Sequence, residues 1–381
     1  MKFVKQAIGV FLIFLTTACQ NEMRPGTTDL NTIELRFSTP FQKEGERFRQ
    51  SVTVGTVGDI LIHDRVYDDA KVERGFDFWP MLKEIAPYLK EPDITIANQE
   101  TMIGGEEIGL SGYPSFNSPF EVGDALKKAG VDVVTLANNH TLDRGPKAIM
   151  NALSYWDELD MMYTGSFKDR NDADDLRVVK KNGLSIAILS YTYGINGIPV
   201  PDNREYLVNL ADSSLMQKQI EEASLQADAV LVALHAGDEY VYYPNKQQKE
   251  WVQLAADSGA TAVIGHHPHV LQPAEWIESE HEHDTLAIYS LGNFLSGQYD
   301  HPRRVGGVFS FELERSSTDG VMVANPRFLP TYVQFEDNDK NYRVRPMKDL
   351  TNEELPNIEK HLDEIETHMS QWLPELVVIK D

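Results

Sequence analysis

The chain has 381 residues with 35 Lys and Arg against 59 Asp and Glu, which gives a formal net charge of −24. Its 41% apolar and 25% charged residues are typical of a packed globular protein and exclude a disordered, collagen-like or polytopic membrane chain. Because nucleic-acid binding depends on Lys and Arg that neutralise phosphates, a chain this acidic is not expected to bind nucleic acid.

Residues 1–19 have the pattern of a signal peptide, with two lysines before an apolar run over 7–15. This run is too short for a membrane-spanning helix of ~20 residues. The segment 1–19 ends at the only cysteine, Cys19. The small Ala18 followed by this cysteine resembles the lipobox of bacterial lipoproteins, in which the cysteine thiol is lipidated. Thr16 stands where a lipobox has a large aliphatic residue, so a secreted protein or an uncleaved anchor remains an alternative. We expect an extracytoplasmic protein, anchored to the cell membrane if Cys19 is lipidated.

The rest of the chain divides into three predicted parts. Residues 20–50 are rich in polar breakers and predict a flexible tether. Residues 51–345 contain no linker and predict a single catalytic domain, and residues 346–381 predict a C-terminal helical extension.

Short apolar, β-branched runs alternate with helical patterns through the predicted domain. The predicted strands are residues 51–57, 93–97, 132–136, 184–190, 229–234, 260–264, 286–289, 308–314 and 327–334. The predicted helices are residues 120–129, 145–159, 213–226, 247–258 and 352–371. Asn182 and Gly183 predict a hairpin turn, so part of a sheet should be antiparallel. The alternation predicts an α/β fold with sheets covered on both faces.

Polar side chains of the kinds that bind metals follow many of the predicted strands. They are Asp59, Asn98, Glu100, Asn138, Asn139, His140, His235, His266, His267, His269, Ser290 and Asn293. Taken singly, Asp59 could cap a turn, the Asn138 and Asn139 pair could begin a helix, and His235 could be a core histidine. The carboxyl ends of strands in an α/β sheet meet at a common crevice. The occurrence of these polar residues at several strand ends together therefore predicts a site for Zn²⁺, Mn²⁺ or Fe²⁺.

These motifs resemble, in order and spacing, those of the bacterial capsule-synthesis CapA family, which is tied to poly-γ-glutamate. The matching segments are 57–60, 97–100, 137–145, 235–240, 265–270 and 289–294. The CapA family is in turn similar to the calcineurin-like metallophosphoesterases. This resemblance implies a four-layer α/β/β/α sandwich with a metal centre at one edge of the paired sheets.

The resemblance also implies roles for individual residues. The implied metal ligands, for one or two divalent ions, are Asp59, Glu100, Asn139, His235, His267 and His269, with His140 and Asp59 catalytic. Residues that could orient these ligands or bind substrate are His63, Asn98, Asn138, Asp143, Glu239, His266, Ser290, Asn293, Arg303 and Arg304.

Two departures from the phosphoesterase pattern put the first ion of a binuclear pair in question. Leu61 replaces the histidine of the opening Asp-x-His motif, and His63 could substitute only if its loop bends toward the site. The second motif carries the longer carboxylate of Glu100 in place of aspartate.

The sequence therefore predicts a metal-dependent hydrolase with a role in poly-γ-glutamate capsule synthesis or export. The expected partners are an anionic polymer such as poly-γ-glutamate or the membrane subunits of capsule synthesis. One alternative is a non-catalytic, membrane-tethered assembly subunit that uses the cleft to bind polymer. Another is a hydrolase of a different cell-envelope polymer or phospho-compound, because a fold does not fix a substrate.

Overall fold

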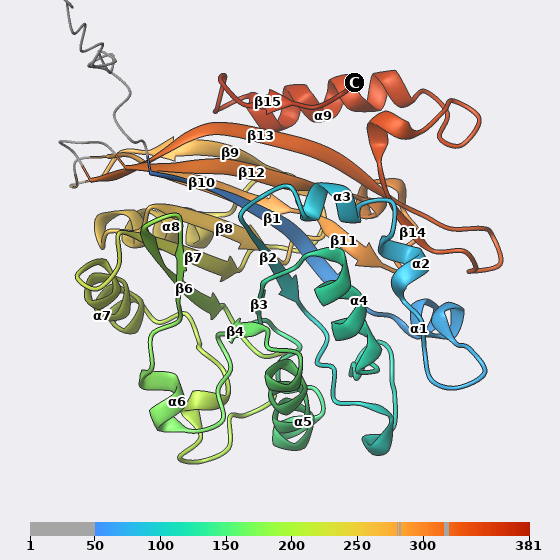
Figure 1. The fold of residues 1–381 in the computed structure, drawn as a ribbon, viewed down its shortest axis with the longest axis horizontal. Helices are drawn as coiled ribbons and strands as arrows, with labels where there is room; N and C mark the ends of the chain where they lie inside the picture. Colours follow the sequence, from blue (N-terminus) through green and yellow to red (C-terminus); the bar gives the residue numbers. More distant parts are fainter. Residues whose placement is uncertain (1–49, 280, 282, 316–319) are drawn as a thin grey trace, which may run out of the picture. The chain divides into compact units, whose positions relative to one another are not determined.

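Two β-sheets pack against each other and carry helices on their outer faces (Figure 1). The computed structural model describes residues 50–279, 281, 283–315 and 320–381, within one compact unit over Phe48–Asp381. The predicted signal peptide, Cys19 and all but the last residue of the predicted tether lie outside the described residues. Among the residues described, no helix has the length and apolar character needed to cross a membrane.

The larger sheet combines a parallel and an antiparallel half. Its order is β14-β13-β12-β1-β2-β3-β4, with β11 added beside β1 and β15 beside β13. Strands β1 to β4 are parallel to one another, whereas β12, β13 and β14 continue the sheet from β1 in antiparallel pairs. The bounds are β1 Ser51–Leu61, β2 Ile94–Gln99, β3 Val133–Thr135, β4 Met162–Thr164, β11 Asn293–Ser296, β12 Val305–Arg315, β13 Val321–Gln334, β14 Arg343–Pro346 and β15 Val377–Val378.

The smaller sheet has the order β5-β6-β7-β8-β10-β9. Its four central strands are parallel, and the edge strands β5 and β9 are antiparallel to their neighbours. The predicted hairpin joins β5 to β6, as expected from Asn182 and Gly183. The bounds are β5 Val178–Lys181, β6 Leu184–Thr192, β7 Ala229–His235, β8 Ala262–His266, β9 Leu271–Ile277 and β10 Thr285–Leu291.

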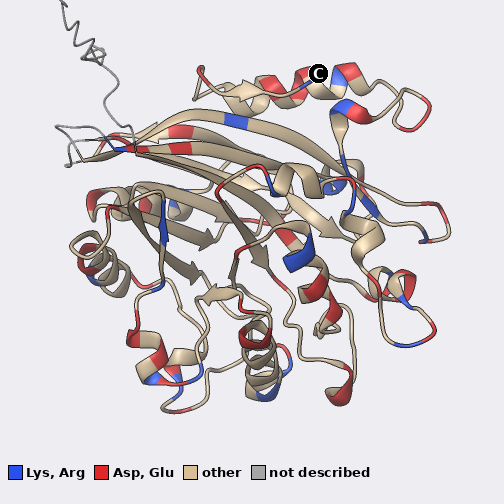
Figure 2. Ribbon diagram, in the orientation of Figure 1, with Lys and Arg blue, Asp and Glu red and all other residues tan. Residues whose placement is uncertain are grey.

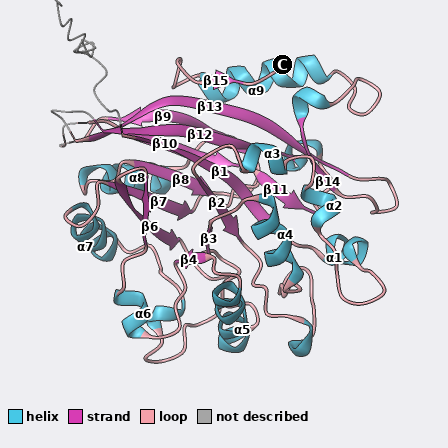
Figure 3. Ribbon diagram, in the orientation of Figure 1, coloured by secondary structure: helices cyan, strands magenta, loops and turns pink. Residues whose placement is uncertain are grey.

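The helices form the outer layers, as Figure 3 shows. Helices α1 to α5 cover the outer face of the larger sheet, and α7 and α8 cover the smaller one. Helix α9 joins the apolar core between the sheets and contacts β9. The bounds are α1 Asp64–Ala70, α2 Trp79–Leu82, α3 Ala86–Leu89, α4 Glu121–Ala129, α5 Gly145–Glu158, α6 Arg170–Asp174, α7 Ser213–Ser224, α8 Lys246–Asp257 and α9 Ile358–Ser370, with short 3₁₀ turns η1 Glu106–Ile108, η2 Glu205–Leu207, η3 His301–Arg304 and η4 Met347–Asp349.

This arrangement is the α/β/β/α sandwich expected from the sequence. Strands β7, β8 and β10 of the smaller sheet are buried on both faces, which explains why β7 is a continuous apolar run without alternation. Helix α8 begins at Asn245, whose side chain caps it together with Gln248, and α4 ends at Gly130 in the left-handed conformation. Figure 2 shows acidic residues on many helices and loops of the outer layers and on some of the strands.

Candidate metal centre

The chain crosses from the smaller sheet to the larger one at Gly292, between β10 and β11. Strand β1 comes so close to this crossing that a Cβ on Gly58 would lie 2.0 Å from the carbonyl oxygen of Gly292. The backbone N–H of Asp59 donates to that same oxygen at 2.9 Å. Since only glycine has no Cβ, Gly58 allows the end of β1 to reach the ends of strands in the other sheet.

Asp59 is fully buried and connects the two sheets through hydrogen bonds. Asn98 Nδ2 donates to its Oδ1 at 2.8 Å, and the backbone N–H of His267 donates to its Oδ2 at 3.3 Å. The Nδ1 atom of His269 lies 3.1 Å from Oδ2, and that of His266 lies 3.4 Å from Oδ1. Burial would raise the pKa of Asp59, but these two imidazoles hold it well below its ordinary value.

Glu100 lies at the centre of a cluster of imidazoles. One ligand atom from each of Glu100, His267 and His269 lies within 4.8 Å of the others. His235 Nε2 is 3.6 Å from Glu100 Oε1 and 2.9 Å from Asn139 Oδ1. The structure therefore brings together all six residues that the resemblance implied as ligands, Asp59 included.

Several atoms of this cluster have no hydrogen-bond partner in the described part of the chain. They are both carboxylate oxygens of Glu100, Nε2 of His266 and Nδ1 of His267. A buried polar group without a partner is costly, and burial raises the pKa of Glu100 well above its ordinary value. A divalent cation would satisfy the Glu100 carboxylate. The cluster thus fits a metal ion, with an oxygen and nitrogen ligand set suited to Zn²⁺, Mn²⁺ or Fe²⁺.

Burial keeps two of the imidazoles in the neutral form that binds metals. It lowers the pKa of His235 well below the ordinary value and that of His267 to about 3. His269 differs, because the charges of Glu100 and Asp59 outweigh its burial and raise its pKa to about 9.

The loop after β8 has a strained backbone. His267 has φ 99° and His269 has φ 58°, in the region that favours glycine. Such conformations cost about 1–3 kcal/mol each and persist where surrounding contacts hold them. Here the contacts of His267 and His269 with Asp59 stabilise these backbone conformations. In these conformations both imidazoles lie in the cluster.

His140 forms a pair with Asp143 beside the cluster. Its Nδ1 atom lies 2.7 Å from Asp143 Oδ2, which also accepts a hydrogen bond from the backbone N–H of Phe116. The Phe116 ring packs against the His140 imidazole at 4.7 Å between centroids. These contacts orient the ring and leave Nε2 free of any protein partner in the described part of the chain. Asn138 fixes the same loop, because its Oδ1 accepts from the backbone N–H of His140.

Three other predicted residues have local structural contacts instead. His63 Nδ1 lies 3.0 Å from the Leu61 carbonyl oxygen and 3.1 Å from the Gly297 nitrogen, so the loop does not bring it into contact with the cluster. Ser290 Oγ accepts from the backbone N–H of Gly292. Glu239 is exposed, and no hydrogen bond joins it to a histidine among the described residues.

The two predicted arginines have different surroundings. The Arg303 guanidinium lies 3.6 Å above the ring of Tyr240, which is 6.1 Å from the His269 ring. Asn293 links the two, because its Nδ2 donates to the Arg303 carbonyl oxygen and its Oδ1 is 3.1 Å from His269 Nδ1. Arg304 instead donates to the Val333 carbonyl oxygen and stacks on Phe335. Arg303 is the arginine beside the site.

A family model described as "Bacterial capsule synthesis protein PGA_cap" matches residues 53–298 of the chain. The chain belongs to this family. The matched range contains every residue of the cluster and leaves out α9 and most of the antiparallel half of the larger sheet.

Two curated relatives come from Bacillus. The "Capsule biosynthesis protein CapA" of Bacillus anthracis is 28% identical over 262 residues, which cover 66% of this chain and 61% of that protein. The "PGA biosynthesis protein CapA" of Bacillus subtilis is 28% identical over 272 residues, covering 69% of this chain and 68% of the relative. The chain thus spans less than two thirds of the Bacillus anthracis protein.

Solved structures with similar folds have low sequence identity. The NAD nucleotidase of Haemophilus influenzae superposes with a TM-score of 0.48 at 11% identity, covering 87% of this chain and 57% of that one. A 5'-nucleotidase precursor from Thermus thermophilus gives a TM-score of 0.45 at 13% identity, covering 84% and 58%.

In this member of the PGA_cap family, two residues after β6 also lie at the cluster, although the sequence analysis did not select them. The Tyr193 ring is 4.7 Å from the His267 ring, and Asn196 contacts both Asn139 and His140. The end of β6 was predicted as a strand end. It carries no carboxylate or imidazole, so the search for metal ligands passed over it.

Proposed function

We propose that this protein acts in capsule synthesis as a metal-dependent hydrolase that cleaves a phosphoryl or acyl bond in an anionic envelope polymer such as poly-γ-glutamate. The observation that carries the proposal is the buried carboxylate of Glu100, which accepts no hydrogen bond from the described residues and lies among the imidazoles of His235, His267 and His269. Family membership and the names of the two Bacillus relatives support the role in capsule synthesis.

Glu100, Asn139, His235 and His267 would hold a single divalent ion. When bound, such an ion lowers the pKa of a coordinated water toward ~7 and polarises the substrate oxygen. Two observations favour one ion over two. Leu61 supplies no ligand, and both oxygens of Asp59 already accept hydrogen bonds. We assign Asp59 the role of orienting the imidazole ligands.

His140 is the residue suited to move a proton. Asp143 accepts from its Nδ1, which orients the ring and directs Nε2 away from the carboxylate. From Nε2, His140 would protonate the leaving oxygen of the substrate. A positioned general acid of this kind contributes typically ~10² to 10⁴ in rate.

Arg303 would bind an anionic group of the substrate. Its guanidinium is held over Tyr240 at the side of the cluster, and a guanidinium can bind a carboxylate or phosphate with two parallel hydrogen bonds. This local cation is needed, because a polyanion approaching a chain of net charge −24 is otherwise repelled.

The proposal is tested by metal analysis together with the substitution His140→Ala. We expect a divalent metal in gently purified protein, and turnover of poly-γ-glutamate or of a phosphoester that falls by ~10² or more in the variant. The variant should keep its metal content, because His140 is not among the proposed ligands. A folded protein that binds no divalent metal would contradict the proposal.

The reduced ligand set around Asp59 favours a second candidate, a membrane-tethered subunit that uses the ion to bind polymer without cleaving it. Capsule production that persists in His140→Ala but is lost in Cys19→Ala would favour this assembly role.

We propose that the protein is exported and anchored through Cys19, and membrane fractionation of the Cys19→Ala variant tests that location.

A further inference from the structure

A second cavity lies on the outer face of the larger sheet, far from the metal cluster. It has a volume of about 400 Å³, within the range of small-ligand pockets. Thr53 lines it and precedes Asp59 by six residues of β1, so the two sites are roughly 20 Å apart along the strand. The proposed hydrolase does not use this cavity.

The floor of the cavity is made by neighbouring strands in register. Thr53 of β1 is opposite Glu312 of β12, and Ser310 of β12 is opposite Arg327 of β13, so all four side chains are on one face. The alternate residues of β12, Phe309 and Phe311, pack into the core between the sheets. A floor fixed by three paired strands is a rigid base for binding.

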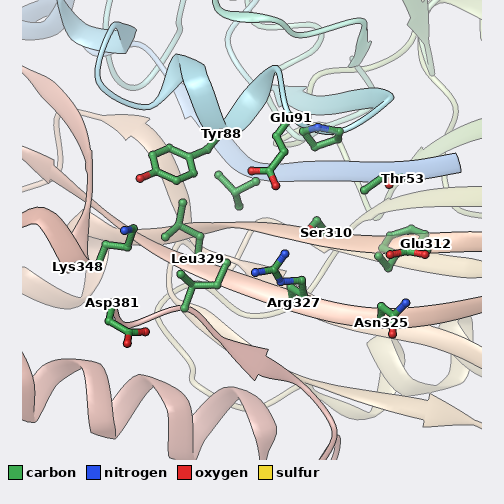
Figure 4. A pocket seen from close by; sticks show the side chains of 14 residues that line it. Thr53, Tyr88, Glu91, Ser310, Glu312, Asn325, Arg327, Leu329, Lys348 and Asp381 are labelled. Atoms are coloured by element: carbon green, nitrogen blue, oxygen red, sulfur yellow. The ribbon is translucent and has the colours of Figure 1, made fainter.

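Charges of both signs face this cavity. Figure 4 shows the Arg327 guanidinium and the Lys348 ammonium group directed into it, with the Glu91 carboxylate facing them from the α3–β2 connection. Within the described part of the chain, the side chains of Arg327, Glu91 and Glu312 have no hydrogen bond or ion pair. Opposite charges are thus separated by open space where each could contact a ligand.

The lining also offers neutral contacts. Thr53, Ser310 and Asn325 provide hydroxyl and amide groups, whereas Tyr88 and Leu329 provide an apolar wall. The Arg327 guanidinium can form charge-assisted hydrogen bonds with a carboxylate of the ligand, and the glutamate carboxylates can form them with an ammonium group of the ligand. The complementary molecule therefore carries one negative and one positive group close to a short aliphatic body.

We propose that this cavity binds a small zwitterion of the α-amino acid class, with its carboxylate on Arg327 and its ammonium group on Glu91 or Glu312. Lys348, whose Nζ is 3.8 Å from Asp349 Oδ1, and Asp381 also line the cavity. Binding here requires no metal, so the site operates independently of the proposed hydrolase.

The test is a titration of the metal-loaded protein with L-leucine and L-glutamine, followed by calorimetry and saturation-transfer NMR. We expect at least one of them to bind, and Arg327→Ala to weaken its binding at least roughly tenfold, because a hydrogen bond to a charged group is lost. Arg170→Ala serves as the matched control. Arg170 is an exposed arginine paired with Glu205 and does not line the cavity.

Blocked ligands test each half of the recognition separately. N-acetyl-L-leucine and N-acetyl-L-glutamine lack the ammonium group, and the corresponding amino acid amides lack the carboxylate, so all should bind at least roughly tenfold more weakly. Glu91→Gln together with Glu312→Gln should weaken the free amino acid but not its N-acetyl form. Equal binding of the free and N-acetylated forms would show that the cavity recognises a simple anion and would overturn the zwitterion proposal. Absence of binding of either amino acid at millimolar concentration would also overturn it. Unchanged metal content in Arg327→Ala shows that either failure is separate from the metal centre.

Discussion

Two fully buried carboxylates, Asp59 and Glu100, have opposite surroundings at the centre of the cluster. Asp59 accepts hydrogen bonds at both oxygens, whereas neither oxygen of Glu100 accepts a hydrogen bond from the described residues. The pKa of Asp59 is lowered and that of Glu100 is raised. These differences support the proposal that Glu100 binds the metal directly and that Asp59 positions the imidazoles.

Substitution of each carboxylate by its amide separates these roles. We expect Glu100→Gln to abolish tight metal binding, because the charged ligand is removed. Asp59→Asn should retain the ion with an affinity reduced about 10- to 100-fold, as is typical when an outer-sphere partner is lost. Calorimetric titration with Zn²⁺ and Mn²⁺ measures both constants. Equal loss of affinity in the two variants would make Asp59 a direct ligand.

At the scale of single residues, the sequence predicted the cluster but not its surroundings. Asp59, Glu100, Asn139 and the imidazoles follow strands whose ends meet, and strands are predictable from apolar runs. The contact of Tyr193 with His267 depends on the path of a loop, for which the sequence has no period. For the same reason, only the structure distinguishes Arg303, which lies beside the site, from Arg304, which packs on Phe335.

At the scale of elements, the approach of β1 to the crossing at Gly292 positions Asp59. Gly58→Ala would place a methyl group 2.0 Å from a backbone oxygen that cannot move freely. We expect a loss of about 1–3 kcal/mol in the free energy of unfolding, as in overpacked cores, together with weaker metal binding. Gly194→Ala is the control, because no atom lies within 4 Å of its added Cβ. Urea denaturation measures both variants, and equal stability would show that the crossing can move.

The 3₁₀ turn η3 meets helix α9 through two histidines whose rings are in contact. The rings of His301 and His361 are 4.3 Å apart, and burial together with the charges of His361 and Arg304 lowers the pKa of His301 to about 4. In the unfolded chain the pKa of histidine is ~6.5, so between these values the unfolded state binds more protons. This histidine therefore contributes stability above pH 6.5 that is lost as the pH falls toward 4.

Replacing His301 by glutamine removes this contribution. We expect the urea midpoint of His301→Gln to fall less between pH 7 and pH 4.5 than that of the unaltered protein. His63 and His267 also have pKa values lowered by burial, to about 4 and about 3, so some acid sensitivity remains in the variant. Parallel pH profiles of the two proteins would refute a role for His301.

At the scale of the whole molecule, the proposed metal ligands come from both sheets. A ligand that binds only the folded state stabilises it by about 2.7 kcal/mol at a hundred times its dissociation constant. Removal of the ion by a chelator should therefore lower the melting temperature by several degrees. Scanning calorimetry with and without the chelator measures this shift in melting temperature. The chelator should not shift the melting temperature of Glu100→Gln, because this variant is expected to bind no metal tightly.

The four-layer architecture was the most predictable property at this scale. Alternating apolar runs and helical patterns predict a covered sheet, and the resemblance to the CapA family implied the pairing of two sheets. The packing of α9 into the core between the sheets was not predicted. Its amphipathic pattern indicates a helix with a buried face but does not say which surface receives that face.

Because Glu100 and Asn139 belong to one sheet's strand ends while His235 and His267 follow strands of the other, a bound cation would act as a clamp across the sandwich. Sliding of one sheet over the other by even an ångström would separate its ligands and release it. Backbone amides of β2 and β7 should exchange with deuterium in step when the clamp is lost.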